Sequence, residues 1–214
     1  MIKLVAFDFD GTLADSVDFC LACFDKVFKK FMGDKAPTRE DIYQTFGMNE
    51  PGVIRYFMGG FVPEAEEYFY QLHRDLHKEW CSDLYPGCRG LLDFLQSKAL
   101  PMTILTGRSE TTCRISLEVL KLEKYFVDMQ NGSPEKNDKA SQMLNLLKKF
   151  DLQPEEMVYV GDAVSDAEAA QRAGVKCLSA AWAKSARIAE LEKINPGLVF
   201  TAVADMQKYL AERI

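Results

Sequence analysis

Residues 4–13 read LVAFDFDGTL, and this stretch decides the fold of the chain. An apolar run of this kind, ended by a glycine, predicts a buried β-strand. The strand delivers two acids, Asp8 and Asp10, and side chains two positions apart on a strand face the same way. Two like charges this close repel each other unless a cation or an incoming group lies between them. The pair therefore indicates a chemical role.

Helical and strand patterns alternate through the second part of the chain. Further strands are predicted at 101–108, 125–130, 157–162, 175–182 and 198–201. Helices are predicted at 88–98, 109–121, 139–150, 165–174 and 204–214. Strands separated by helices form parallel βαβ units, and the opening strand must join them because it has no other partner. We predict an α/β fold: a doubly wound parallel sheet with a Rossmann-like core.

Residues 16–83 predict an inserted all-helical unit, because their helical spacing is broken only at glycines and prolines. The sequence thus divides into a core domain, residues 1–15 and 84–214, and a helical cap domain, residues 16–83. The first helix of the cap is expected over 16–32, capped by Asp15 or Ser16. Its buried stripe is expected to hold Phe19, Cys23, Val27 and Phe31.

The composition is that of an ordinary globular protein, with 48% hydrophobic and 27% charged residues among 214. The formal net charge of -6 argues against nucleic acid or an anionic membrane as partner. No apolar run approaches the roughly 20 residues of a membrane span, and no signal-peptide pattern opens the chain. We therefore expect a cytoplasmic protein whose partner is neither nucleic acid nor membrane.

Two further patterns have alternative interpretations. Cys20 and Cys23 form a C-x-x-C, which occurs in redox and zinc sites, but no second ligand pair completes a tetrahedral set. Buried structural cysteines are the preferred interpretation. His73 and His77 have metal-binding i,i+4 spacing, but without a third ligand they are interpreted as a solvated helix face.

Polar residues follow several of the predicted strands, at the edge where ligands bind in open parallel sheets. They are Asp8, Asp10, Gly11 and Thr12; Thr106, Gly107 and Arg108; and Gly161, Asp162 and Asp166. Lys136 and Lys139 precede the helix at 139–150. Asp162 and Asp166 also suit a helix N-terminus, which is the alternative to a site. Together, the hydroxyls, carboxylates and lysine match an Mg²⁺-dependent phosphate site.

The chemistry explains each residue type. A carboxylate can attack phosphorus and form an aspartyl-phosphate. Mg²⁺ prefers oxygen ligands, for which Asp8, Asp162, the backbone carbonyl of Asp10 and a nearby Asp166 are suited. The phosphate oxygens need donors, such as the Thr106 hydroxyl and a lysine ammonium. Asp10 can protonate the leaving oxygen and later accept a proton from water.

The segments DFDGTLADS, ILTGR, a lysine before a helix, and VGDAVSD resemble the four motifs of the haloacid dehalogenase-like (HAD) superfamily. The insertion resembles its C1 cap, as in phosphoglycolate phosphatase and beta-phosphoglucomutase-like members. The resemblance implies that Asp8 is the nucleophile, Asp10 the general acid/base and Thr106 the phosphate-binding hydroxyl. It makes Lys139 the third-motif lysine, with Lys136 as alternative because the family's Lys-Pro is absent. Asp162 and Asp166 become the metal motif.

These features predict an Mg²⁺-dependent phosphatase acting on a small phosphorylated metabolite. Thr106, Gly107, Arg108 and Lys139 are expected to bind substrate, although Arg108 alternatively is an exposed loop residue. By fold analogy, Arg55 and the loop 47–50 lie where cap residues select the substrate. The rivals are a phosphotransferase such as a sugar phosphomutase and a non-catalytic binding protein. The chain is expected to be a monomer or a dimer.

Overall fold

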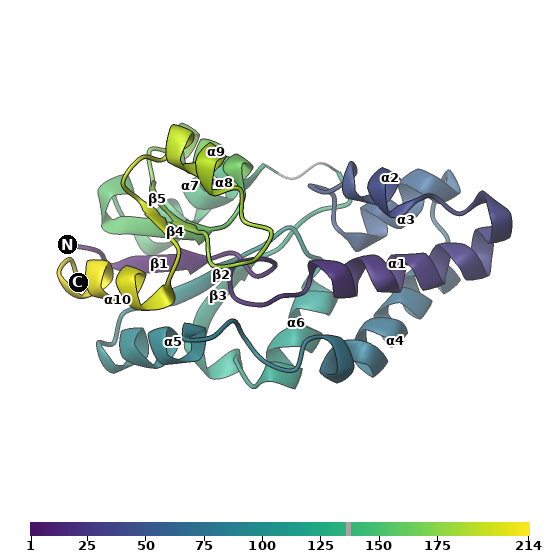
Figure 1. Cartoon of the computed structure of the whole chain (residues 1–214), viewed down its shortest axis with the longest axis horizontal. Helices are drawn as coiled ribbons and strands as arrows, with labels where there is room; N and C mark the ends of the chain where they lie inside the picture. The colour runs from purple at the N-terminus through teal and green to yellow at the C-terminus, as the bar shows by residue number, and fades with distance from the viewer. Residues whose placement is uncertain (136–137) are drawn as a thin grey trace.

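The computed structural model describes residues 1–135 and 138–214, which contain a six-stranded parallel sheet (Figure 1). The strands are β1 (Leu4–Phe7), β2 (Met102–Leu105), β3 (Phe126–Gln130), β4 (Met157–Gly161), β5 (Lys176–Ala180) and β6 (Val199–Phe200). Their order is β3-β2-β1-β4-β5-β6. Successive strands are added on one side of β1 up to β3 and on the other side from β4 onward, so the strand order reverses between β1 and β4. The predicted α/β fold is confirmed.

Helices cover both faces of this sheet, which explains why β1 is apolar at every position. Val5 and Phe7 face a core shared with α5 (Cys88–Ser97), α6 (Glu110–Leu120) and α10 (Val203–Ala211). Leu4 and Ala6 face a second core shared with α7 (Lys139–Phe150) and α8 (Val164–Ala173). A helix that the sequence patterns did not predict, α9 (Ile188–Ile194), packs on α8. Short 3₁₀ turns precede β3 and β4, at Glu123–Tyr125 and Pro154–Glu156.

Residues 17–80, called the helical segment below, contain no strand, as their pattern predicts. The segment holds α1 (Val17–Met32), a 3₁₀ turn (Gly33–Lys35), α2 (Arg39–Tyr43), α3 (Glu50–Met58) and α4 (Pro63–Trp80). Figure 1 shows it beyond the carboxyl end of β1, with the N- and C-termini at the opposite end of the molecule. The helical segment therefore faces the edge of the sheet where the predicted site residues lie.

Two expectations for α1 were wrong. Phe19, Cys23 and Val27 are buried, but Phe31 is 37% exposed. Steps of four residues advance about 40° beyond a full turn each, so Phe31 is rotated by about 120° from Phe19 around the helix. Ser16 occupies the N-cap position but its side chain makes no capping bond. Its hydroxyl donates instead to the carboxylate of Asp10.

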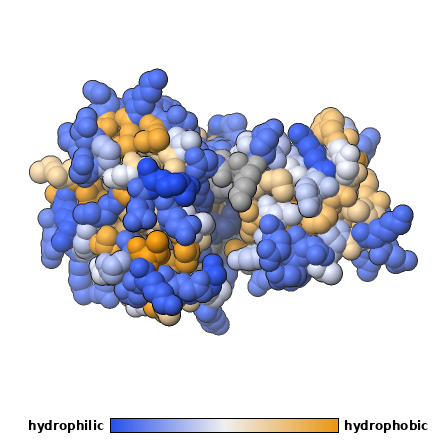
Figure 2. Space-filling view, turned by 90° about the horizontal axis from the view of Figure 1, so that it is seen from above, coloured by the Kyte–Doolittle hydropathy of each residue, from blue (hydrophilic) through white to orange (hydrophobic). Residues whose placement is uncertain are grey.

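The surface of the molecule mixes polar and apolar residues (Figure 2). Hydrophobic residues show on the helical segment as well as on the sheet domain, and large exposed ones include Tyr43, Tyr56 and Phe61. Across the described ranges, no helix combines the length and the apolar character needed to cross a membrane.

The burial difference along α1 predicts unequal costs for two phenylalanines of the same helix. Phe24 is 1% exposed and its ring lies 4.6 Å from that of Phe69 on α4. Phe24→Ala should lower the free energy of unfolding by about 3–5 kcal/mol, because it leaves a cavity between α1 and α4. Phe31→Ala, the matched control, should cost less than about 1 kcal/mol. Urea unfolding followed by circular dichroism measures both; equal losses would contradict the packing described.

Candidate active site

Three acidic residues converge at the carboxyl ends of β1 and β4, where the strand order reverses. Asp8 follows β1, Asp162 follows β4, and Asp166 lies in the first turn of α8. One carboxylate oxygen from each lies within 4.8 Å of the others. The topology of the sheet therefore brings residues about 150 positions apart in the chain into one cluster, at the edge where α/β proteins bind ligands.

Lys139, the first residue of α7, lies against this acidic cluster. Its Nζ donates to Oδ2 of Asp8 and Oδ1 of Asp166, both at 2.6 Å, and to the Tyr159 hydroxyl at 3.0 Å. Burial lowers the pKa of Lys139, but Asp166 and Asp8 outweigh it and hold the pKa well above its usual value. Lys139 is therefore a fixed positive charge. The alternative lysine, Lys136, lies outside the described residues.

The cluster still carries more negative charge than Lys139 neutralises. Burial raises the pKa of Asp8 to about 6, against the opposing effect of Lys139. Burial also raises the pKa of Asp162 to about 8, and the carboxylates of Asp8 and Asp166 add to the rise. Oxygen ligands that are short of a counter-charge and converge in this way suit a divalent cation such as Mg²⁺. The residues present thus fit the predicted metal.

Two glycines allow the acids to approach the backbone this closely. A Cβ on Gly11 would lie 2.3 Å from Asp162 Oδ2, and the φ of Gly11 is +74°. A Cβ on Gly161 would lie 2.5 Å from Asp166 Oδ2. Only glycine avoids these clashes and adopts the left-handed backbone at position 11 without strain. The glycines that follow the strands are therefore part of the site geometry.

The helix-capping alternative holds for one of the two acids of the last motif. Asp166 Oδ2 accepts the backbone N–H of Ala163 at 3.0 Å, so Asp166 stabilises the start of α8 while its other oxygen binds Lys139. Asp162 instead accepts a hydrogen bond from the Thr12 hydroxyl at 2.9 Å. Asp162 is therefore held by the loop after β1.

Asp10 has a different environment from Asp8. Arg108 donates to both of its oxygens, from Nε to Oδ2 at 2.8 Å and from Nη2 to Oδ1 at 2.6 Å. The Ser16 hydroxyl donates to Oδ1 at 2.6 Å. Burial raises the pKa of Asp10, but Arg108 and Ser16 outweigh it and leave the pKa below its usual value. The Asp10 carboxylate thus has its own cation.

The alternative that Arg108 is an exposed loop residue is wrong. Its side chain is only 3% exposed and its guanidinium lies over the ring of Phe9, 4.5 Å from the ring centre. Burial lowers its pKa, but Asp10 more than restores it, so the group stays charged. The bidentate pair with Asp10 satisfies the carboxylate in the geometry that arginine forms best.

The interpretation of His73 and His77 as a solvated face is also wrong, since both are 0% exposed. Their rings pack on Phe19, at 4.6 and 5.3 Å between ring centres. Both Nε2 atoms lie within hydrogen-bond distance of the Ser116 hydroxyl on α6, at 3.2 and 2.8 Å. A polar partner on the facing helix allows these side chains to be buried.

The second motif contains a buried hydroxyl, that of Thr106, and a glycine, Gly107, with free space where a side chain would begin. Thr106 is 0% exposed and its Oγ1 accepts the backbone N–H of Arg108 at 3.3 Å. A Cβ on Gly107 would meet no other atom within 4 Å, whereas a Cβ on Gly132 would lie 2.0 Å from the Gly107 carbonyl oxygen. The loop after β2 is therefore packed on one side against the loop 131–135.

The helical segment contacts the sheet domain through the start of α3. The Glu50 carboxylate accepts the Ser109 backbone N–H at 2.7 Å and the Thr112 hydroxyl, both at the start of α6. Asn49 donates to the Gly132 carbonyl at 3.0 Å and caps α3. Arg55 pairs with Glu66 within the segment, at 2.8 Å. The loop 47–50 thus lies beside the second motif.

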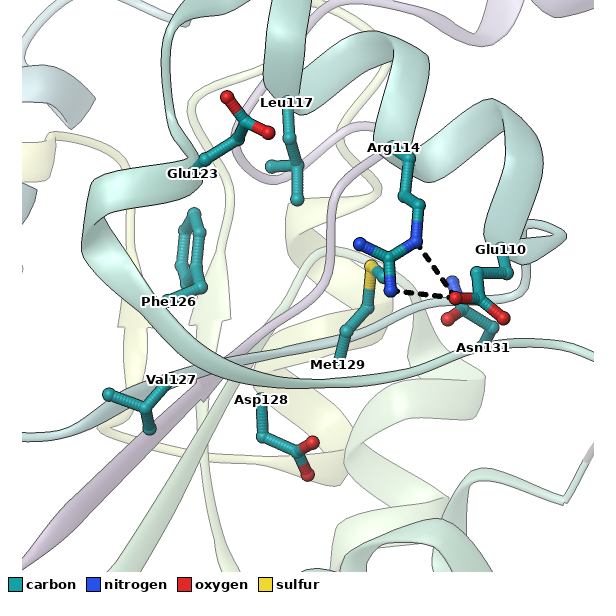
Figure 3. A pocket seen from close by; sticks show the side chains of 9 residues that line it. All are labelled: Glu110, Arg114, Leu117, Glu123, Phe126, Val127, Asp128, Met129 and Asn131. Carbon is teal, nitrogen blue, oxygen red and sulfur yellow. Dashed lines mark hydrogen bonds and ion pairs between the residues drawn. The ribbon is translucent and has the colours of Figure 1, made fainter.

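The other candidates lie outside this cluster. All six cysteines are free, and Cys20 is the one that is not fully buried, which agrees with the structural interpretation. A pocket between α6 and β3 is lined by Arg114, which pairs with Glu110, and by Phe126 and Met129 (Figure 3). It holds none of the predicted site residues.

Three contacts of the site were not found from the sequence. Tyr159, the one hydroxyl in the buried strand β4, binds Lys139 and Asp166. Ser116 lies on the buried stripe of α6, three residues after Cys113. Ser16 directly precedes α1, so the sequence indicates a helix cap and not a partner of Asp10. Polar residues within apolar patterns were the available signal.

The chain is similar to known proteins. A sequence profile of the haloacid dehalogenase-like hydrolases matches residues 5–180. The chain belongs to this family. It is also 30% identical over 223 residues to a phosphoglycolate phosphatase of Pseudomonas fluorescens, covering 94% of this chain and 81% of that protein. The predicted membership of the HAD superfamily is confirmed.

Solved structures of HAD-like hydrolases share the fold. A haloacid dehalogenase-like family hydrolase from Streptococcus pneumoniae superposes with a TM-score of 0.75 at 24% identity, over 98% of each chain. A hydrolase from Pseudomonas syringae gives a TM-score of 0.72 at 24% identity, over 100% of this chain and 99% of that one. Both matches extend across the sheet domain and the helical segment.

The raised pKa of Asp162 predicts how metal-free protein responds to pH. A carboxyl whose pKa is about 8 when folded and near 3.8 when unfolded binds more protons in the folded state, so its contribution is lost as pH rises from about 4 to 8. In chelator at pH 8, Asp162→Asn should therefore melt at least about 3 °C above wild type, with the difference vanishing near pH 4. Calorimetry across pH measures this.

The matched control for this experiment is Asp128→Asn. Lys149 and neighbouring hydrogen bonds outweigh burial and lower the pKa of Asp128, so its removal should have the opposite sign. Added Mg²⁺ should raise the melting temperature of wild type and not that of Asp162→Asn. A variant that is less stable than wild type at pH 8 in chelator would contradict the excess negative charge described.

Proposed function

We propose that this HAD-like hydrolase is an Mg²⁺-dependent phosphatase that hydrolyses a small phosphorylated metabolite through an aspartyl-phosphate on Asp8. The observation that carries the proposal is the cluster of Asp8, Asp162 and Asp166 within 4.8 Å, bridged by Lys139 at 2.6 Å from two of them. The similarity to phosphoglycolate phosphatases supports this reaction class and makes phosphoglycolate the first substrate to test.

In the first step, an oxygen of Asp8 bonds to phosphorus while the bond from phosphorus to the leaving oxygen breaks. The backbone N–H of Phe9 donates to Asp8 Oδ1 at 2.7 Å and Lys139 to Oδ2, which fixes the attacking carboxylate. Lys139 and the Thr106 hydroxyl are the donors available for the phosphate oxygens. Asp10 gives its proton to the leaving oxygen.

In the second step, water attacks the phosphorus and Asp10 takes up the proton, which releases phosphate and restores Asp8. Asp8, Asp162, Asp166 and the Asp10 carbonyl would hold Mg²⁺. When bound, the cation supplies the positive charge that lets a phosphate dianion approach these acids. Burial raises the pKa of Asp8, and the positive charge of the cation would favour its reactive, ionised form.

The helical segment, residues 17–80, is proposed to act as the cap that selects the substrate. Its α3 contacts the start of α6, directly after the second motif, through Glu50, and its α4 contacts Arg108 through His73 at 3.3 Å. A cap in this position excludes water from the reacting phosphate and surrounds the leaving group. The reaction is proposed to take place in the cytoplasm.

The nucleophile assignment predicts the effect of Asp8→Asn. The amide is nearly isosteric but cannot form the aspartyl-phosphate, so turnover should fall by more than about 10⁴-fold while the fold is retained. Phosphate release from a panel of phosphorylated metabolites, with Mg²⁺ and with chelator, measures this. Retained activity in the variant would exclude Asp8 as nucleophile, and isomerised products would indicate a phosphomutase.

The lysine assignment predicts unequal effects of two alanine substitutions. Lys139 contacts both Asp8 and Asp166, so Lys139→Ala should lower kcat/KM by about 100-fold, as the loss of a transition-state donor does. Lys136→Ala, the matched control three positions earlier in the sequence, should change kcat/KM by less than about threefold. Steady-state kinetics on the best substrate of the panel decides; the reverse ranking would assign the third motif to Lys136.

A further inference from the structure

A chain of buried side chains runs from the helical segment to Asp10. It begins with His73 and His77 of α4, continues through Ser116 of α6, and ends with Arg108, which binds Asp10 (the Arg108 network). Arg108 Nη1 donates to the Ser116 hydroxyl at 2.6 Å and lies 3.3 Å from His73 Nε2. All the members up to Arg108 are at most 4% exposed. Elements far apart in the sequence thus meet behind the proposed acid/base.

The donors of Arg108 are almost fully assigned by these contacts. Its guanidinium carries five N–H groups, of which two go to Asp10, one to Ser116 and one to His73 Nε2. The Phe9 ring covers one face of the group. Arg108 therefore has little capacity left for a substrate, which was the role expected for it from the sequence.

The two histidines are neutral in this arrangement. Arg108 can only donate, so a lone pair of His73 Nε2 must face it. Burial and the charge of Arg108 hold the pKa of His73 well below its usual value and lower that of His77 to about 4. Neutral rings can accept from Arg108 and Ser116 without adding a second positive charge, so they hold the guanidinium in place.

The same contacts leave one acceptor position open on Asp10. A carboxylate has about four such positions, two on each oxygen. Nη2 and the Ser16 hydroxyl occupy Oδ1, and Nε occupies one position on Oδ2. The side chain of Asp10 is 29% exposed, against 3% for Arg108. The position left for proton exchange is therefore on Oδ2.

We infer that Ser116, His73 and His77 are positioning residues, which act through Arg108 to hold Asp10 with Oδ2 toward the reacting phosphate. The inference rests on the proposed function, since it assigns the atom that exchanges the proton. Oδ2 loses its proton to the leaving oxygen as the bond to phosphorus breaks, and later takes a proton from the attacking water. A helix of the proposed cap thereby takes part in aligning the acid of the sheet domain.

The test compares two substrates that differ in their need for a proton. p-Nitrophenyl phosphate releases a stable phenolate, whereas p-nitrobenzyl phosphate releases an alkoxide that must be protonated. Ser116→Ala should lower kcat/KM for the benzyl ester by about 10- to 100-fold and for the phenyl ester by no more than about threefold, because misplacing a general acid affects only the first. The ratio kcat/KM reports the step in which the leaving group departs.

Three variants separate positioning from a loss of structure. Cys113→Ala, one turn earlier on α6 and equally buried, is the matched control and should leave the ratio between the two substrates unchanged. Arg108→Lys keeps the charge but loses the bidentate contact. It should therefore lower kcat/KM for the benzyl ester selectively, and it tests the inference even if Ser116→Ala folds poorly. In an Asp10→Asn background, Ser116→Ala should have almost no further effect on the benzyl ester.

Equal losses on the two esters, or additive effects of Ser116→Ala and Asp10→Asn, would overturn the positioning role while leaving the phosphatase intact. Wild type that releases phosphate from neither ester nor from the metabolite panel would instead contradict the proposed function, and the positioning role with it. Unchanged kinetics in Arg108→Lys would return Arg108 to the role of a structural residue.

Discussion

Two carboxylates can follow one strand two positions apart because each is paired with a different cation. Asp8 is bound by Lys139 and Asp10 by Arg108, each at 2.6 Å. Neither cation is near in sequence: Lys139 begins α7 and Arg108 follows β2. The site therefore depends on the parallel sheet, which places the ends of β1, β2 and β4 side by side. Without that topology the repulsion between the two acids would be uncompensated.

The two cations divide the site into unequal halves. Arg108 and Ser16 more than balance the burial of Asp10, and its pKa falls. On the other side, Asp8, Asp162 and Asp166 share Lys139, and the pKa values of Asp8 and Asp162 rise. The half that lacks positive charge is where a divalent cation and a phosphate group are favourable together. The balanced half needs no further cation, and Arg108 and Ser16 hold the Asp10 carboxylate in a fixed orientation.

The sequence was sufficient for the sheet and for the acids at its edge. The central strands β1 and β4 are compact, fully buried runs, and the spacing of the acids that follow them is read directly from the sequence. The helix predicted at 139–150 begins at Lys139, as α7 does. These features depend on local pattern and on the rule that parallel strands end at one edge. That is why the sequence alone predicts that Asp8, Asp162 and Lys139 lie close together.

The misassigned residues have their partners on other elements. The pattern of α4 predicts that His73 and His77 are solvent-exposed. Nothing in the local sequence indicates that Ser116 of α6 lies opposite them. The local sequence around Arg108 does not indicate that its side chain is buried, because its partner, Asp10, is 98 positions away. A buried polar side chain is tolerated only when a partner satisfies it, so its burial is a property of the pair. Sequence periodicity describes single elements and therefore misses it.

The same contacts connect the helical segment with the chemistry proposed for the site. If the segment moved away from the sheet domain, α4 would withdraw His73 and His77 from Ser116 and Arg108, and Glu50 would leave the start of α6. Arg108 would then keep Asp10 and Ser116, which belong to the sheet domain, but lose His73. Buried polar groups need partners, and these contacts supply them in the arrangement described here. The side chains that we propose to align the acid therefore come from both the helical segment and the sheet domain.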